Sequence, residues 1–124
     1  MFSYEKLEVY KKASQTNQKV YQLLKQNKSI PSFAKNQFGR ASHSVMLNIA
    51  EGSAKISNRD RRNFYITARG SAFECASLIG FLNGEGEIAD DLKEELYSSF
   101  EEISKMLFAM IRNLDKSRED ISRC

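Results

Sequence analysis

The sequence has few of the residues that build disulfide-bonded, turn-rich or membrane-spanning proteins. Its 124 residues include two Cys, one Pro, six Gly and no Trp. Two Cys do not make a disulfide framework, so we expect a reducing compartment, the cytoplasm. Sparse Gly and Pro disfavour a β-sandwich or barrel, which needs many turns. No apolar run approaches the roughly 18 residues of a membrane span, and the first residues lack the apolar core of a secretory signal.

Metal ligands and catalytic groupings are equally scarce. His43 is the one histidine, and no Glu stands three residues before it, as di-iron helix bundles require. Structural zinc needs about four Cys or His ligands, which Cys75, Cys124 and His43 do not supply. The sequence shows no Ser–His–acid order and no glycine-rich phosphate loop. We therefore expect no catalytic residue, no metal and no cofactor, and an enzyme is the least favoured class of function.

Four long segments with helical periodicity make up most of the chain. Apolar residues recur every three or four positions over residues 4–26, 33–51, 58–82 and 89–114, and a polar tail at 115–124 is predicted to fray. Short connections make successive helices antiparallel neighbours. A chain of this length forms one domain. The sequence therefore predicts a single all-α domain over residues 1–124, an antiparallel up-down-up-down four-helix bundle.

Capping patterns predict where the two middle helices begin and end. Ser32, next to Pro31, is the expected N-cap of the second helix. Gly52 is the expected left-handed residue that ends this helix. Ser57 and Asp60 have the spacing of a capping box that opens the third helix.

Apolar seams run along the third and fourth segments. In the third, six positions follow heptad spacing, namely Phe64, Ala68, Ser71, Cys75, Leu78 and Leu82. A second stripe lies beside this seam, formed by Tyr65, Ala68, Ala72, Ala76 and Ile79. We expect Cys75 to be a core residue. Tyr97, Phe108 and Ile111 lie off the seam of the fourth segment and provide apolar surface for a further partner.

Charge is distributed unevenly along the chain, whose net charge is +3. Residues 1–69 carry 13 Lys and Arg against 4 Asp and Glu, a net charge of +9. Residues 70–124 carry 6 against 12, a net charge of −6. This asymmetry predicts either a basic face for an acidic partner such as nucleic acid, or two halves that attract each other when packed.

The densest basic cluster lies at the predicted turn between the second and third helices, and comprises Lys55, Arg59, Arg61 and Arg62. Arginine binds phosphate through two parallel hydrogen bonds, and helix N-terminal amides add to the attraction. With Asp60 engaged in the capping box, we expect these side chains to be free to bind phosphates; the alternative is a solvated basic turn. Phe64 and Tyr65 are expected in the core, so base stacking should add little to binding.

Charged residues near the seams are predicted to tie the second helix to the third. If the chain folds back around residue 56 or 57, Arg40 faces Glu74, and Glu51 faces Arg62. We therefore expect Arg40, Glu51, Arg69 and Glu74 to be partly buried and paired. Structural ion pairs are favoured here over acid–base catalysis by Glu51 and Glu74.

Two stretches resemble the signatures of the 23S rRNA intervening-sequence protein family. Residues 39–52 end in Asn48-Ile49-Ala50-Glu51-Gly52, and residues 64–74 contain Ala68-Arg69-Gly70-Ser71 before Glu74. The opening residues 4–13 are similar to the family's first-helix motif, so the resemblance spans about residues 4–114. The positions carried over as a structural signature are Arg40, Asn48, Glu51, Gly52, Arg69, Gly70 and Glu74.

The resemblance implies a bacterial four-helix protomer that assembles into a ring-shaped homopentamer. The family is also similar to the accessory variability protein of diversity-generating retroelements, which binds nucleic acid and its reverse transcriptase through a basic surface. We therefore expect a non-enzymatic, oligomeric protein that binds RNA or DNA phosphates, without contact with a membrane. The alternative is a protein-interaction scaffold that docks a nucleic-acid enzyme such as a reverse transcriptase.

Overall fold

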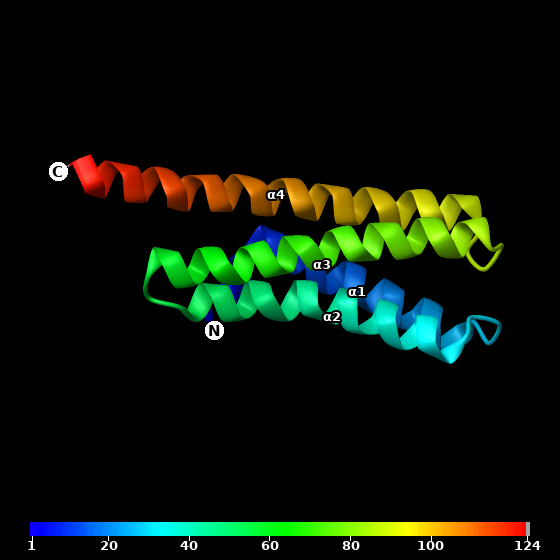
Figure 1. The fold of residues 1–124 in the computed structure, drawn as a ribbon. Helices are drawn as coiled ribbons and strands as arrows, with labels where there is room; N and C mark the ends of the chain where they lie inside the picture. The colour runs from blue at the N-terminus through cyan, green and yellow to red at the C-terminus, as the bar shows by residue number, and fades with distance from the viewer. Residues whose placement is uncertain (124) are drawn as a thin grey trace.

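A computed structural model of the chain describes the backbone of residues 1–123 and the side chains of residues 1–116 (Figure 1). Every regular element in the described part is helical: the 3-10 helix η1 (Ser3–Lys6) and the α-helices α1 (Glu8–Gln26), α2 (Ser32–Ala54), α3 (Asn58–Gly84) and α4 (Asp90–Arg123). The prediction of an all-α four-helix bundle is confirmed. Cys124 lies outside the described residues.

Successive α-helices run antiparallel, and α4 returns to pack against α1. The diagonal pairs, α1 with α3 and α2 with α4, do not pack against each other within the described residues, as expected for a bundle with four corners. Figure 1 shows the α1–α2 and α3–α4 connections at one end of the bundle. The α2–α3 connection lies at the opposite end, where α4 runs past it.

The helix boundaries differ from the predicted ones at several places. α1 begins at Glu8 because Leu7 is extended (φ −76°, ψ 127°) and separates it from η1. Pro31, rather than Ser32, is the N-cap residue of α2. α4 continues to Arg123, where the sequence predicted a frayed tail from residue 115. No Gly or Pro follows Gly86, so no helix breaker interrupts α4.

Gly52 lies within α2 and does not end it. The helix continues to Ala54, and the only positive φ among the described residues is the 77° of Gly86 in the α3–α4 turn. The prediction of a left-handed Gly52 is therefore wrong. Gly52 is buried where α2 meets α3, and a Cβ atom placed on it would lie 2.7 Å from Cε1 of Tyr65. Its missing side chain sets how closely the two helices approach.

The core face of α3 combines its two predicted stripes. The six buried residues of this helix, drawn from both stripes, are Tyr65, Ala68, Ala72, Cys75, Ile79 and Leu82. Phe64, Ser71 and Leu78 are only half-buried. Cys75 is 0% exposed, which confirms its place in the core. Burial raises the pKa of its thiol, and the Glu74 carboxylate raises it further.

The α4 seam is buried from Leu96 to Leu107, and Ile111 joins it. Ile111 was predicted to lie off the seam, but the core extends over it because α4 remains packed on α3 as far as Asp115. Tyr97 and Phe108 are exposed, as their positions off the seam predicted.

Candidate nucleic-acid interface

The basic cluster occupies a tight connection between two long helices. Only residues 55–57 separate Ala54, the last residue of α2, from Asn58, the first of α3. The Ser57 hydroxyl accepts a hydrogen bond from the backbone amide of Asp60 at 3.1 Å, which confirms the predicted N-cap. The reciprocal bond from the Ser57 backbone amide to the Asp60 carboxylate is not formed among the described residues, so Asp60 is not engaged as predicted.

Three members of the cluster have partners within the protein. Nε of Arg61 donates to the backbone oxygen of Lys55 at 2.6 Å, which satisfies a carbonyl at the end of α2. The Lys55 ammonium lies 4.0 Å from the Glu51 carboxylate and 5.1 Å from the centre of the Phe64 ring. Nε of Arg62 donates to Asp115 of α4 at 2.7 Å. The prediction that these side chains are all free is therefore wrong.

Arg59 is the exposed and unpartnered member of the cluster within the described residues. The guanidinium groups of Arg61 and Arg62 each use their Nε donor in the bonds above, and each carries further N–H donors on its terminal nitrogens. The cluster thus presents one free arginine and two arginines that are positioned by the fold.

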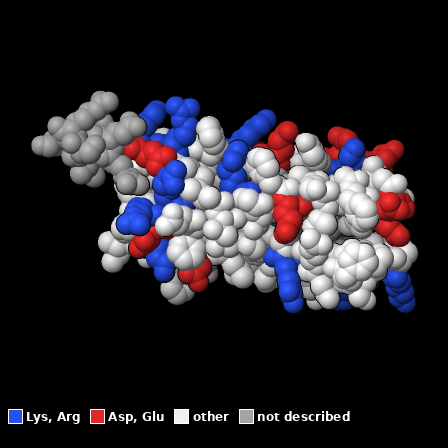
Figure 2. Space-filling view, in the orientation of Figure 1, with Lys and Arg blue, Asp and Glu red and all other residues white. Residues whose placement is uncertain are grey.

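Two further basic residues reach this end from α4. Arg62 lies beside Asp115, and Arg69 lies 5.3 Å from the Phe108 ring; these contacts set the antiparallel register of α3 and α4. Arg112 and Lys116 are exposed on the turns of α4 around Asp115. Figure 2 shows positive side chains gathered at this end of the bundle and acidic ones mainly toward the other. The sequence analysis missed both residues because they lie about 50 positions from the connection and were assigned at or near a frayed tail.

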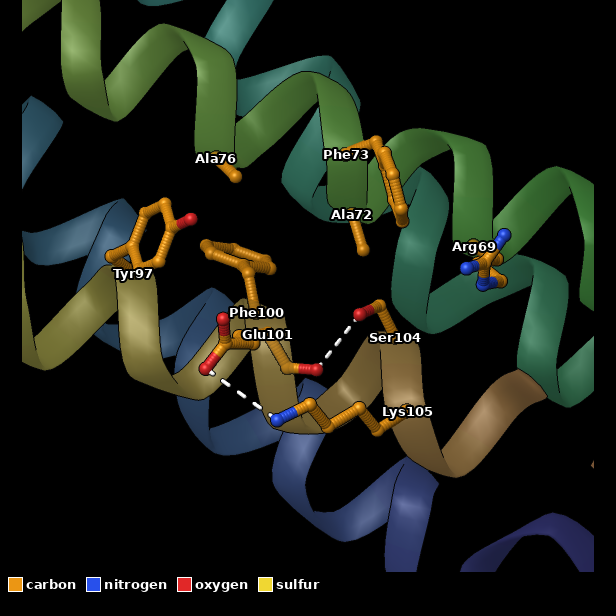
Figure 3. Close-up of a pocket in the computed structure, with 9 residues that line it drawn as sticks. All are labelled: Arg69, Ala72, Phe73, Ala76, Tyr97, Phe100, Glu101, Ser104 and Lys105. Atoms are coloured by element: carbon orange, nitrogen blue, oxygen red, sulfur yellow. Dashed lines mark hydrogen bonds and ion pairs between the residues drawn. The ribbon is translucent and has the colours of Figure 1, made fainter. Parts of the chain in front are cut away.

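A groove of about 330 Å³ lies between α3 and α4 (Figure 3). Phe73, Tyr97 and Phe100 form aromatic walls around it, and Arg69 stands at one end. The Arg69 guanidinium lies 4.7 Å from the centre of the Phe73 ring, and its buried Nε has no hydrogen-bond partner among the described residues. Exposed aromatic side chains such as Phe73 and Tyr97 are typical of a face that a partner covers.

Among the described residues, no group of three or more His, Cys, Asp and Glu side chains is placed to hold a metal ion. His43 is exposed on α2, and its Nδ1 lies 3.1 Å from the side-chain nitrogen of Asn17. No helix in the described part of the chain has the length and apolar character needed to cross a membrane.

Comparison with known proteins decides the family. The family model described as "23S rRNA-intervening sequence protein" matches residues 5–109. The chain belongs to this family. A crystal structure of a protein of unknown function from the S23 ribosomal protein family of Bacteroides thetaiotaomicron has the same fold, with a TM-score of 0.80 and 24% identity. The match covers 83% of this chain and 97% of that one. No curated protein matched the chain.

The family signature contributes to the contact between α2 and α3 through small and polar side chains. The side-chain nitrogen of Asn48 donates to the backbone oxygen of Ser44 at 2.8 Å and lies 2.9 Å from its hydroxyl. The Ser44 hydroxyl in turn lies 2.8 Å from that of Ser71 on α3. Gly52 provides the close approach described above. Gly70, in contrast, is exposed, and a Cβ atom placed on it would meet nothing within 4 Å.

The predicted ion pairs of the signature do not form among the described residues. Glu51 lies near Lys55 rather than Arg62, which instead binds Asp115. Arg40 and Glu74 line one shallow hollow between α2 and α3 but make no ion pair, and both are exposed. The connection at residues 55–57 lies where the fold-back was predicted, and the pairs fail because Arg40, Glu51 and Glu74 are exposed to solvent.

Glu74→Ala should therefore change the free energy of unfolding by less than about 0.5 kcal/mol, as for an exposed side chain without an ion-pair partner. Urea denaturation followed by circular dichroism measures this. A loss of 3 kcal/mol or more, the size expected for breaking a buried ion pair, would contradict the exposed position of Glu74.

Proposed function

We propose that the protein is a non-enzymatic, cytoplasmic homo-oligomer that binds nucleic-acid phosphates at the end of the bundle that carries the α2–α3 connection. The observation that carries this proposal is the convergence of Lys55, Arg59, Arg61 and Arg62 with Lys116 of α4 at one end. Such phosphate contacts position a backbone but carry little sequence information. Binding is therefore weakly sequence-specific and strongly dependent on salt.

We expect the protomers to contact one another through the outer surface of α3 and α4. Ile66, Phe73 and Phe81 are exposed along α3, and Tyr97 and Phe108 are exposed on α4. Between the α3 residues lie Gly70 and Gly80, around which there is open space within the protomer. Large apolar side chains beside glycines suit a helix from another copy that packs closely. A ring repeats the basic end once per protomer, and several weak phosphate sites together raise the avidity.

Sedimentation equilibrium tests the assembly. We expect a mass that is a multiple of the 14.2 kDa chain, five chains by the family resemblance, at micromolar concentration. Phe73→Ser together with Phe108→Ser should lower the mass toward one chain. Tyr21→Ser is the control, because Tyr21 is also an exposed aromatic residue but lies on α1, outside the proposed assembly surface. A wild-type mass of 14.2 kDa would contradict the oligomer.

Replacing Arg59, Arg61 and Arg62 together by Gln tests the nucleic-acid interface. We expect the affinity for a short oligouridylate to fall about tenfold at low salt. The slope of affinity against salt should also flatten by about 0.7 per lost phosphate contact. Fluorescence anisotropy over a salt series measures both, and sedimentation with circular dichroism verifies that the oligomer and the fold are intact.

Two further variants test whether the loss of affinity is specific to the basic cluster. Lys25, Lys28 and Lys35 lie near the opposite end of the bundle, and replacing them by Gln removes the same charge without touching the proposed interface. Arg59→Gln with Lys116→Gln removes two side chains that have no partner among the described residues, so packing is unaffected. Equal losses of affinity in the two triple variants would show that only net charge attracts the oligonucleotide, and the proposed interface would be wrong.

A further inference from the structure

An exposed aromatic pair lies at the start of the chain. Phe2 is 72% exposed, and its ring stacks on that of Tyr4 with centroids 5.9 Å apart and planes at 10°. Tyr4 is itself held edge-on by Tyr10, with centroids 4.6 Å apart. The two rings are thus stacked, and Tyr10 of α1 supports Tyr4, while the Phe2 ring remains exposed to solvent.

The backbone around Phe2 is also held in place. Its amide donates to the Glu5 carboxylate at 3.1 Å, and its carbonyl accepts from the Glu5 amide at 3.2 Å. The first bond is the acidic half of a capping box, and the second is the opening backbone bond of the 3-10 helix η1. An aromatic side chain on a fixed backbone loses little conformational entropy when a ligand stacks on it.

η1 packs at the basic end of the bundle. Ser3 and Leu7 line a hollow of about 220 Å³ together with Ser53, Arg61 and Tyr65. The residue that follows Phe2 therefore shares a hollow with an arginine of the basic cluster. Figure 1 places the N-terminus close to the α2 turns near that end. The sequence predicted no aromatic platform here, since Phe2 and Arg61 are far apart along the chain.

A cationic surface beside an open aromatic ring is the arrangement that binds single-stranded nucleic acid. The cations hold the phosphates, and unpaired bases stack on the ring. A protein partner would need acidic groups, and a duplex keeps its bases stacked on one another. We infer that Phe2, supported by Tyr4, is a base-stacking platform for single-stranded nucleic acid whose phosphates lie on the basic cluster. This inference rests on the proposed function and adds the single-stranded ligand class and the contact with its bases.

The test compares two oligonucleotides with the same number of phosphates, an oligoadenylate and its abasic counterpart. Wild-type protein should bind the base-containing strand about fivefold or more tightly, the lower range for stacking of one base. Phe2→Leu keeps an apolar side chain but removes the ring, so the two strands should then bind equally. The salt slope should be unchanged, because no phosphate contact is lost.

Phe2→Trp supplies a second readout, because the chain contains no other Trp. Its fluorescence should be quenched by the base-containing strand and not by the abasic one. Ile56→Ser is the matched control: Ile56 is 96% exposed in the α2–α3 connection but carries no ring. We expect this variant to keep the wild-type preference for bases.

The outcomes distinguish a failure of the stacking platform from a failure of the proposed phosphate interface. Equal binding of both strands by wild-type protein would overturn the stacking platform and leave the phosphate interface standing. A preference for bases that survives in Phe2→Leu, or that Ile56→Ser removes equally, would also overturn the platform. Binding of neither strand at low salt would overturn both.

Discussion

Cys75→Arg is expected to leave the protein largely unfolded or to lower its stability by about 4 kcal/mol or more. The Cys75 side chain is 0% exposed among the apolar residues of the core. Burial of an unpaired charge costs several kcal/mol, and the larger side chain adds about 1–3 kcal/mol of overpacking. A domain of this kind is stable by only about 5–15 kcal/mol in total. The raised pKa of the thiol reflects the same resistance of this position to charge.

Urea denaturation followed by far-UV circular dichroism measures this change. Cys75→Ala is the control, because it removes a sulfur from the same position without adding charge or volume, and it should cost about 1 kcal/mol. A Cys75→Arg protein with the wild-type denaturation midpoint would mean that the arginine reaches solvent, and that α3 is turned differently in the bundle.

Gly52→Ala is expected to destabilise the protein by about 1–3 kcal/mol, although alanine normally stabilises a helix relative to glycine. A Cβ atom at this position would lie 2.7 Å and 2.9 Å from two ring carbons of Tyr65, and 3.1 Å from Cβ of Phe64. The Tyr65 side chain is 5% exposed, and the Cβ atom of Phe64 is fixed by the α3 backbone and cannot turn away. α2 and α3 would have to move apart, and the core between them would lose its packing.

Gly39→Ala provides the matched control in the same helix. Its Cβ atom would meet Leu24 at 3.6 Å, an ordinary van der Waals contact. This variant should gain about 0.5–1 kcal/mol from the higher helix propensity of alanine. Denaturation of the two variants under one set of conditions isolates the contribution of the close approach. Equal gains in stability would refute a steric role for Gly52.

The sequence alone determined the helical class, the number of long helices and most of the core. These features depend on local periodicity, because apolar residues spaced three or four apart must share one helix face. The Ser57 cap was also predictable, since its bond to the Asp60 amide spans only three residues. Cys75 was placed in the core for the same reason, by its position on the seam of α3.

Tertiary structure decided which side chains meet. Arg62 binds Asp115 across 53 residues of sequence, and Ser3 shares a hollow with Arg61. Local sequence patterns contain no information on contacts between residues that are far apart along the chain. Such contacts depend on the register of the packed helices. Although the α2–α3 connection lies where the fold-back was predicted, Glu51 lies near Lys55 rather than Arg62, and Gly52 is buried against Tyr65. A half-turn of helix moves a side chain to the opposite face, so the direction in which each side chain points decides the pairs while the fold remains the same.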